Sequence, residues 1–221
     1  MLDFTTTAVS RPAIIDKTYA SFQKNLKDID LKECTLYINI DPFPPDSNRA
    51  KVVEVCKRYF KTVVYRTPSE ANFTGAINWL WTQATSPLIF HIEDDWKLVK
   101  PVSLMKLISF FTTNPYLLQV ALRAYPYKYD RCCLSPSLIA KKFYKSVAGN
   151  LDESLNPEVQ LRGHVFGIDL PSKDMGISHK GKVVVFPEKD IVLKDMGRAW
   201  IEQTHFTRPP KKNQFTSWIE K

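Results

Sequence analysis

Short apolar runs alternate with amphipathic segments along the first half of the chain, and this alternation limits the fold more than any other feature. The apolar runs cover residues 4–9, 34–40, 62–65 and 87–92. Each is short enough for a strand, and the segments between them carry apolar side chains at helical spacing. Strands that alternate with helices form βαβ units, whose strands lie parallel in one sheet. The pattern therefore predicts an α/β fold with a mostly parallel central sheet.

The segments between these runs contain signals for where helices begin and where loops lie. Ser10, Arg11 and Pro12 read as the entry to a helix, with Ser10 as a candidate cap and Pro12 tolerated in the first turn. Further helices are predicted over residues 49–59 and 72–85. The proline-rich stretch at 41–46 excludes helix and central strand, so it is predicted to be a loop at the end of the second strand.

The second half has a weaker pattern. It predicts an amphipathic helix at 102–111, a strand at 117–122 and a helix at 135–147 that Ser135 caps. Residues 183–186 resemble a strand, and 208–212 resemble an exposed basic tail. No internal repeat or low-complexity tract marks a domain boundary, so we expect one domain over residues 1–221.

Composition excludes several classes of protein. Of 221 residues, 44% are hydrophobic and 24% are charged, which excludes a disordered, collagen-like or coiled-coil chain. No apolar run approaches the ~20 residues of a membrane span, and residues 1–12 do not resemble a signal peptide. Four cysteines without C-x-x-C spacing suggest reduced thiols. We therefore expect a cytoplasmic protein, of a host cell if it is viral, with no membrane partner.

All the excess positive charge lies in the second half of the chain. Residues 1–96 hold 11 basic and 12 acidic side chains, a net charge of −1, whereas residues 97–221 hold 20 and 11, a net charge of +9. A solvated basic surface would explain this asymmetry, and so would a surface that faces a polyanion. Both readings stay open on charge alone.

Three acids follow directly after the fourth apolar run. Glu93, Asp94 and Asp95 would be costly to place at the end of a buried strand unless a cation lies among them. Ligands bind at the carboxyl ends of strands in open α/β sheets, and carboxylate oxygens suit Mg²⁺ or Mn²⁺ together with a phosphate. A metal site and an acidic turn that caps the next helix are both consistent with the triplet.

Several motifs in this order resemble the GT-A-fold glycosyltransferases, and most closely the family 2-like nucleotide-sugar transferases. They are the SRP after the first strand, Asp41 after the second, the NFTGAINWLW helix from Asn72, and the apolar run that ends in Glu-Asp-Asp-Trp. The resemblance covers about residues 4–96 well. It implies a GT-A (Rossmann-like) fold and a D-x-D-type motif, in which Asp95 ligates the metal and Glu93 contacts the donor or also the metal. The donor-binding residues that it implies are Ser10, Arg11, Asp41, Asn72, Asn78, Glu93, Asp94 and Arg198.

The same resemblance implies a catalytic base on a later loop before a helix. The matching residue is Glu158, within Asn-Pro-Glu-Val-Gln. A base at this position would take the proton from an acceptor hydroxyl as its oxygen attacks the sugar. Asp152 and Glu153 are alternatives for this role, and Glu158 is also explained as an acid that stabilises a helix N-terminus.

Many members of that family supply a late histidine to the metal. Asp195 stands at the matching position here and can itself ligate a hard cation, and His205 is the alternative ligand. Arg198 and the tail residues Lys211 and Lys212 are candidates to close over the donor diphosphate, although surface charge explains them too.

Together these features predict a glycosyltransferase that uses Mn²⁺ or Mg²⁺ and a nucleotide-sugar, with a UDP-sugar favoured and inversion favoured over retention. Residues 1–96 would bind the donor and 97–221 the acceptor. The charge asymmetry and a resemblance to small phage-type transferases favour double-stranded DNA with a hydroxymethylated pyrimidine, such as hydroxymethylcytosine, as acceptor. The alternatives are a surface glycan, a lipid-linked saccharide, or another class altogether: a metal-dependent nucleotidyltransferase or a non-catalytic sugar-nucleotide binder. The oligomeric state is left open.

Overall fold

A seven-stranded sheet forms the centre of the computed structural model, which describes residues 2–44, 48–125, 132–166, 182–203, 206–207 and 219–220. The strands lie in the order β10-β8-β9-β5-β1-β3-β4. In chain order they are β1 (Asp3–Val9), β3 (Thr35–Asp41), β4 (Thr62–Arg66), β5 (Leu88–Glu93), β8 (Gln119–Leu122), β9 (Ser137–Ala140) and β10 (Val183–Phe186).

The sheet is mostly parallel, as the alternation of strands and helices predicts. Strand β1 pairs in parallel with β3 and β5, β3 with β4, and β8 with β10. Strand β9 lies between β5 and β8 and runs antiparallel to both. Strands from before and after residue 96 therefore share one sheet.

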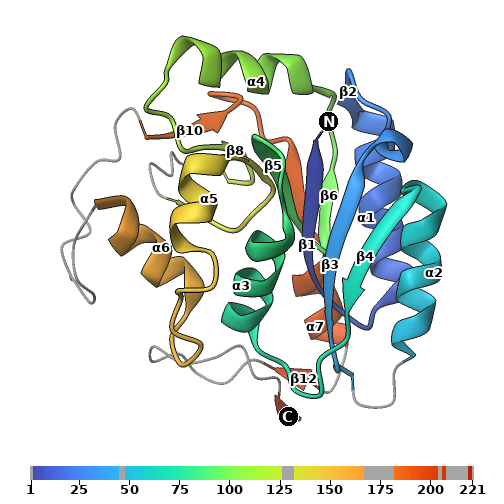
Figure 1. Ribbon diagram of the computed structural model, residues 1–221. Helices are drawn as coiled ribbons and strands as arrows, with labels where there is room; N and C mark the ends of the chain where they lie inside the picture. The colour runs from blue at the N-terminus through green and yellow to red at the C-terminus, as the bar shows by residue number, and fades with distance from the viewer. Residues whose placement is uncertain are drawn as a thin grey trace.

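Helices cover both faces of the sheet (Figure 1). On one face lie α1 (Pro12–Asn25) and α2 (Arg49–Tyr59), whose apolar sides pack on the sheet in one hydrophobic core. On the other lie α3 (Phe73–Gln83), α5 (Lys141–Val147) and α6 (Pro157–Phe166), which form a second core. Because both faces are covered, the inner strands β1, β5, β8 and β9 are mostly buried, whereas the edge strand β4 is partly exposed.

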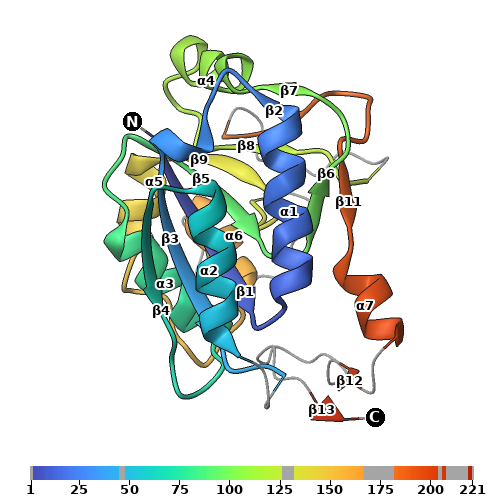
Figure 2. The same ribbon diagram turned by 90° about the vertical axis from the view of Figure 1, so that its right-hand side faces the viewer.

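Smaller elements lie around the sheet and the helices that cover it (Figure 2). Helix α4 (Leu104–Thr113) covers the end of the molecule at which β1 begins, and α7 (Gly197–Gln203) lies toward the opposite end. Strand β6 (Trp96–Leu98) pairs with β11 (Leu193–Asp195), which leads into α7. The remaining elements are η1 (Leu31–Glu33), β2 (Leu26–Lys27), β7 (Val102–Ser103), β12 (Phe206–Thr207) and β13 (Ile219–Glu220).

Two predicted elements in the second half are wrong in detail. Residues 135–147 do not form one helix that Ser135 caps, because residues 137–140 are strand β9 and the helix α5 begins only at Lys141. Residues 102–103 pair with β2 as a short strand, so α4 begins at Leu104 with the side chain of Ser103 as its cap.

In the first half of the chain, Ser10 is not the cap of α1. Arg11 occupies the cap position, and its side chain makes no cap hydrogen bond.

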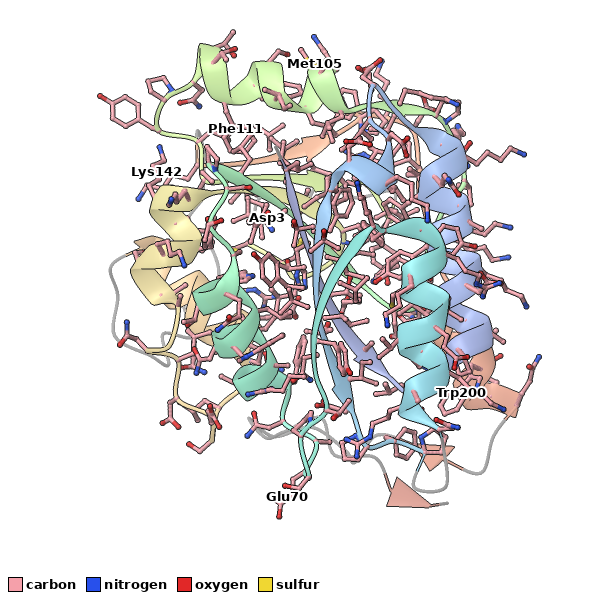
Figure 3. All side chains as sticks on the ribbon, turned by 45° about the vertical axis from the view of Figure 1, so that its right-hand side comes forward. Asp3, Glu70, Met105, Phe111, Lys142 and Trp200 are labelled. Atoms are coloured by element: carbon pink, nitrogen blue, oxygen red, sulfur yellow. The ribbon has the colours of Figure 1, made fainter. Side chains whose placement is uncertain are left out.

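The carboxyl ends of β1, β3 and β5 meet at one end of the sheet. Val9 is paired with Asp41, and Thr7 with Glu93. Figure 3 shows Trp200 of α7 and Glu70, which precedes α3, at this end, with Met105 of α4 at the other. The register therefore brings together the residues that follow three strands.

Candidate functional site

A pocket lies at the carboxyl ends of these three strands. It is built from the end of β1 and Arg11, the end of β3, the start of α3 and the acidic triplet after β5. Its lining residues are Thr7, Ala8, Val9, Arg11, Asp41, Ala71, Phe73, Glu93, Asp94 and Asp95. All of them precede residue 96, so the pocket comes entirely from the half of the chain that was predicted to bind the donor.

Arg11 is the cation among the three acids. Its Nη2 donates to Asp94 Oδ1 at 2.6 Å and to Asp95 Oδ2 at 3.1 Å, and its Nε donates to Asp94 Oδ2 at 3.3 Å. The side chains of Arg11 and Asp94 are 4% and 6% exposed. Burial alone would lower the pKa of Arg11, but the two carboxylates raise it above its ordinary value. Arg11 is therefore permanently charged and fixed in place.

Asp94 connects β1, α1 and β5. Its Oδ2 also accepts from the backbone N–H of Val9, and its carbonyl accepts from Thr18 Oγ1 at 2.7 Å. Each carboxylate oxygen of Asp94 thus has a protein donor, and its role in this structure is to hold Arg11 against the strand ends.

Asp95 carries negative charge that Arg11 neutralises only in part. Burial raises its pKa to about 6, and the nearby charges of Asp94 and Asp195 raise it as well, whereas Arg11 lowers it. When ionised, Asp94 and Asp95 together carry two negative charges, and Arg11 supplies one positive charge beside them. A second cation beside Asp95 would balance the remaining charge.

The structure brings Asp195 next to Asp95. The pairing of β11 with β6 places Asp195 opposite Trp96, and the backbone N–H of Met196 donates to the carbonyl of Asp95 at 2.8 Å. Gly197 marks how close the two acids are, because a Cβ atom there would lie 2.1 Å from Asp95 Oδ2 and 3.3 Å from Asp195 Oδ1. Asp195 Oδ1 also accepts from the backbone N–H groups of Gly197 and Arg198 and so caps α7.

Trp200 covers Arg11 from the side of α7, a contact that the sequence analysis missed. The guanidinium carbon of Arg11 lies 5.0 Å from the centroid of the Trp200 ring. The ring also makes an edge-to-face contact with Phe43 at 6.0 Å. No local pattern links Trp200 to Arg11, since the contact depends on the β6–β11 pairing.

Asp41 is held by a chain of two polar side chains that the sequence analysis also missed. Asn39 Nδ2 donates to Asp41 Oδ1 at 2.7 Å, and Arg66 Nε donates to Asn39 Oδ1 at 2.7 Å. Arg66 in turn lies over the ring of Trp79, with 5.5 Å from its guanidinium carbon to the ring centroid. Burial raises the pKa of Asp41 to about 6. The sequence did carry a signal for this arrangement, since Asn39 is an amide within the apolar run 34–40, and the structure buries it fully.

Two buried polar atoms at the end of β1 have no hydrogen-bond partner among the described residues. They are Ser10 Oγ and Arg11 Nη1. Buried polar atoms are nearly always paired, so such atoms beside a pocket indicate room for a polar ligand. Glu93 also lines the pocket, and its Oε2 accepts from Trp96 Nε1 at 2.7 Å.

Asn72 and Asn78, predicted to border the donor, make other contacts. Asn72 caps α3, since the backbone N–H of Gly75 donates to its Oδ1 at 2.7 Å. Asn78 is buried, and both atoms of its amide bond the backbone of Leu151. Neither residue lines the pocket.

Glu158 is the second residue of α6. Its Oε1 accepts from the backbone N–H of Leu134 at 3.1 Å, and its Oε2 lies 3.5 Å from Arg162. Glu158 does not line the pocket, but Cys133 lies within electrostatic range of both Glu158 and Glu93. The alternatives Asp152 and Glu153 are exposed on the loop before α6.

The predicted residues after Asp195 have different outcomes. Arg198 is exposed on α7 and bonds Asp195 and the hydroxyl of Tyr125. His205 and the basic residues 208, 211 and 212 lie outside the described residues.

Comparisons with known proteins find similarity in structure and none in sequence. No protein-family model matches the chain, and no curated protein matches its sequence. Its structure is similar to the mannosyltransferase PcManGT from Pyrobaculum calidifontis in complex with GDP-Man and Mn²⁺, with a TM-score of 0.62 and 9% identity over 85% of this chain and 55% of that one. The chain has the GT-A fold.

Two structures of TarS from S. aureus share this GT-A fold. TarS 1–349 gives a TM-score of 0.57 and 12% identity over 85% of this chain and 58% of that one. Its complex with UDP-GlcNAc gives 0.57 and 10%, over 85% and 56%. The chain thus spans just over half the length of these structures. Among the described residues, no helix is both long and apolar enough to cross a membrane.

Proposed function

We propose that this chain is a metal-dependent glycosyltransferase that moves a sugar from a nucleotide-sugar, with a UDP-sugar favoured, to a hydroxyl acceptor. The observation that carries the proposal is the set of Arg11, Asp95 and Asp195 at the carboxyl end of the sheet, where α/β folds bind ligands. It is supported by a fold shared with structures that hold GDP-Man and UDP-GlcNAc.

Mn²⁺ or Mg²⁺ fits the oxygen atoms of Asp95 and Asp195. Both carboxylates approach the same point above Gly197, and Arg11 supplies only one positive charge beside the two carboxylates of Asp94 and Asp95. Among the described residues no cluster of three or more His, Cys, Asp or Glu side chains could hold an ion. The donor phosphates and water would have to complete the shell, as is usual for Mg²⁺. When bound, the ion supplies charge neutralisation on the leaving diphosphate.

The residues of the chain itself would orient the donor and activate the acceptor. Arg11 Nη1 and Ser10 Oγ are unpaired donors that suit phosphate oxygens. Glu158 would take the proton of the acceptor hydroxyl while that oxygen bonds to C1 of the sugar and the bond from C1 to the diphosphate breaks. A single base without a nucleophile between it and the sugar favours inversion.

DNA with a hydroxymethylated pyrimidine is the acceptor that we favour. The support is the net charge of +9 on residues 97–221 beside a pocket that draws its lining from residues 7–95. Basic side chains would contact phosphates, and the modified base would have to leave the stack for its hydroxyl to reach the sugar.

The experiment is a transfer assay with UDP-glucose, UDP-GlcNAc and GDP-mannose, each with Mn²⁺. The acceptors are DNA that contains hydroxymethylcytosine and unmodified DNA of the same sequence. We expect release of the nucleoside diphosphate and a hexose-sized mass addition on the modified nucleoside alone. Release of pyrophosphate would indicate a nucleotidyltransferase. Donor binding without turnover on DNA or on glycan acceptors would indicate a sugar-nucleotide binder, and transfer to glycans alone would exclude DNA.

A further inference from the structure

Side-chain amides from two helices grip the loop between α5 and α6. Asn78 Nδ2 on α3 donates to the carbonyl of Leu151 at 2.8 Å, and the N–H of Leu151 donates back to Asn78 Oδ1 at 3.1 Å. Gln160 on α6 makes the same pair of hydrogen bonds to the backbone of the next residue, Asp152. Its Oε1 accepts from the N–H of Asp152 at 2.8 Å, and its Nε2 donates to the carbonyl of Asp152 at 3.0 Å. We call Asn78 and Gln160 with these two backbone partners the amide clamp.

Further contacts bind the rest of the loop to α3. Thr74 Oγ1 donates to the carbonyl of Leu155, and Asn72 Nδ2 donates to that of Glu153 at 3.3 Å. Gly75 has no side chain, which lets Glu153 of the loop lie close to α3. A Cβ atom at Gly75 would lie only 3.1 Å from Glu153 Oε2. Polar side chains at the start of α3 and along its first two turns thus make hydrogen bonds to the loop backbone at residues 151, 153 and 155.

The loop ends where α6 begins, and Glu158 lies in the first turn of that helix. Asn156 Oδ1 accepts from the N–H of Glu158 at 2.9 Å. One turn on, Leu161 is fully buried in the same core as Ile77 and Leu80 of α3. The start of α6 is therefore fixed relative to α3 in two ways: by the hydrogen bonds of the amide clamp and by the apolar contacts of this core.

We propose that Asn78 and Gln160 are positioning residues, which hold the 151–155 loop so that Glu158 faces the acceptor. This inference rests on the proposed function, because it takes Glu158 as the base. It differs from a role of Asn78 in donor binding, since both ends of that amide are engaged with Leu151. A base acts only within hydrogen-bond reach of the proton that it removes, and a displacement of about 1 Å can cost a hundredfold in rate.

The test compares Asn78→Leu and Gln160→Leu with the wild-type chain. Gln83→Leu is the matched control, because Gln83 is an exposed amide in the last turn of α3. Hydrogen exchange on the full chain measures the backbone amides of residues 151–158, and calorimetry measures the affinity for UDP with Mn²⁺. Turnover is measured on the donor and acceptor pair that the transfer assay identifies. Gln160 is partly exposed, so its variant keeps the test valid if loss of buried Asn78 unfolds the chain.

We expect exchange in residues 151–158 to accelerate at least tenfold in both clamp variants, with kcat about 10- to 100-fold lower and UDP affinity within twofold of wild type. The control should match wild type in all three measurements. Loss of UDP affinity with unchanged exchange would overturn the proposal and return Asn78 to the donor site. Faster exchange with unchanged kcat would also overturn it. A wild-type chain that transfers no sugar would overturn the proposed function instead, and the exchange measurement, which needs no donor, tells the two failures apart.

Discussion

Asp41 is a partly buried carboxylate in the pocket, and its ionisation lowers the stability of the fold. It lines the pocket, its pKa is raised to about 6 by burial, and Asn39 and Arg66 hold it in place. The unfolded chain would ionise it near 3.8. Because the folded state binds the proton more tightly, stability that is present below about pH 4 is lost as the pH rises through 6.

Asp41→Asn should therefore stabilise the protein at neutral pH. We expect a gain of up to about 3 kcal/mol at pH 7.5, which shrinks toward zero at pH 4 because Asp41 is then largely protonated. Urea unfolding of both chains at the two pH values measures this difference. Asp190→Asn is the control, since its exposed ion pair with Lys100 should contribute little at either pH. Equal gains at both pH values would show that ionisation of Asp41 is not the cause.

Glu158→Gln tests the base at the same scale. The amide keeps the shape of the side chain and an oxygen for the N–H of Leu134, but it cannot take a proton. We expect kcat to fall by about 10²–10⁴-fold with donor affinity nearly unchanged. Steady-state kinetics with calorimetry of UDP measures both quantities. Turnover close to wild type would move the role to Asp152 or Glu153.

At the scale of elements, the parallel part of the fold was predictable and its antiparallel insertion was not. The βα order placed Arg11, Asp41 and Asp95 at one edge because parallel strands end together. In β9 the sequence is Ser-Leu-Ile-Ala, and four such residues carry no strand signal of their own. Pairing with β5 and β8 on both sides decides its conformation, so tertiary context overrides local preference. The link from Asp95 to Asp195 through β6 and β11 was suggested by family resemblance, not by local pattern.

Helix α7 contributes to the site through its first residue. Gly197→Ala would place a methyl group 2.1 Å from the present position of Asp95 Oδ2, so the carboxylate or the helix must move. We expect Mn²⁺-dependent UDP affinity to fall about tenfold or more while circular dichroism stays unchanged. Ala199→Ser, an exposed change in the same helix, is the control. Unaltered affinity would show that Asp95 is not held in place by α7.

At the scale of the whole molecule, the division of charge predicts how DNA affinity depends on salt. If residues 97–221 face DNA, each neutralised phosphate releases counterions on binding, so log K against log[salt] should slope downward by several units. Joint replacement of Arg208, Lys211 and Lys212 by Ala should flatten this slope and change UDP affinity much less, because the pocket draws its lining from residues 7–95. Filter binding at several salt concentrations measures the slope. No measurable DNA affinity at low salt would leave saccharide acceptors as the alternative.

The place of β9 in the sheet also has a consequence for how the chain is made. Strands β1, β3, β4 and β5 can assemble as soon as residue 93 is available, but the outer edge of β5 stays open until β9, which ends at Ala140, has been synthesised. At 5–20 residues per second this takes roughly 2–10 s. Through that interval the nascent chain exposes an apolar strand edge of the kind that pairs with other chains. Slow translation between residues 93 and 140 would therefore favour aggregation of the newly made protein.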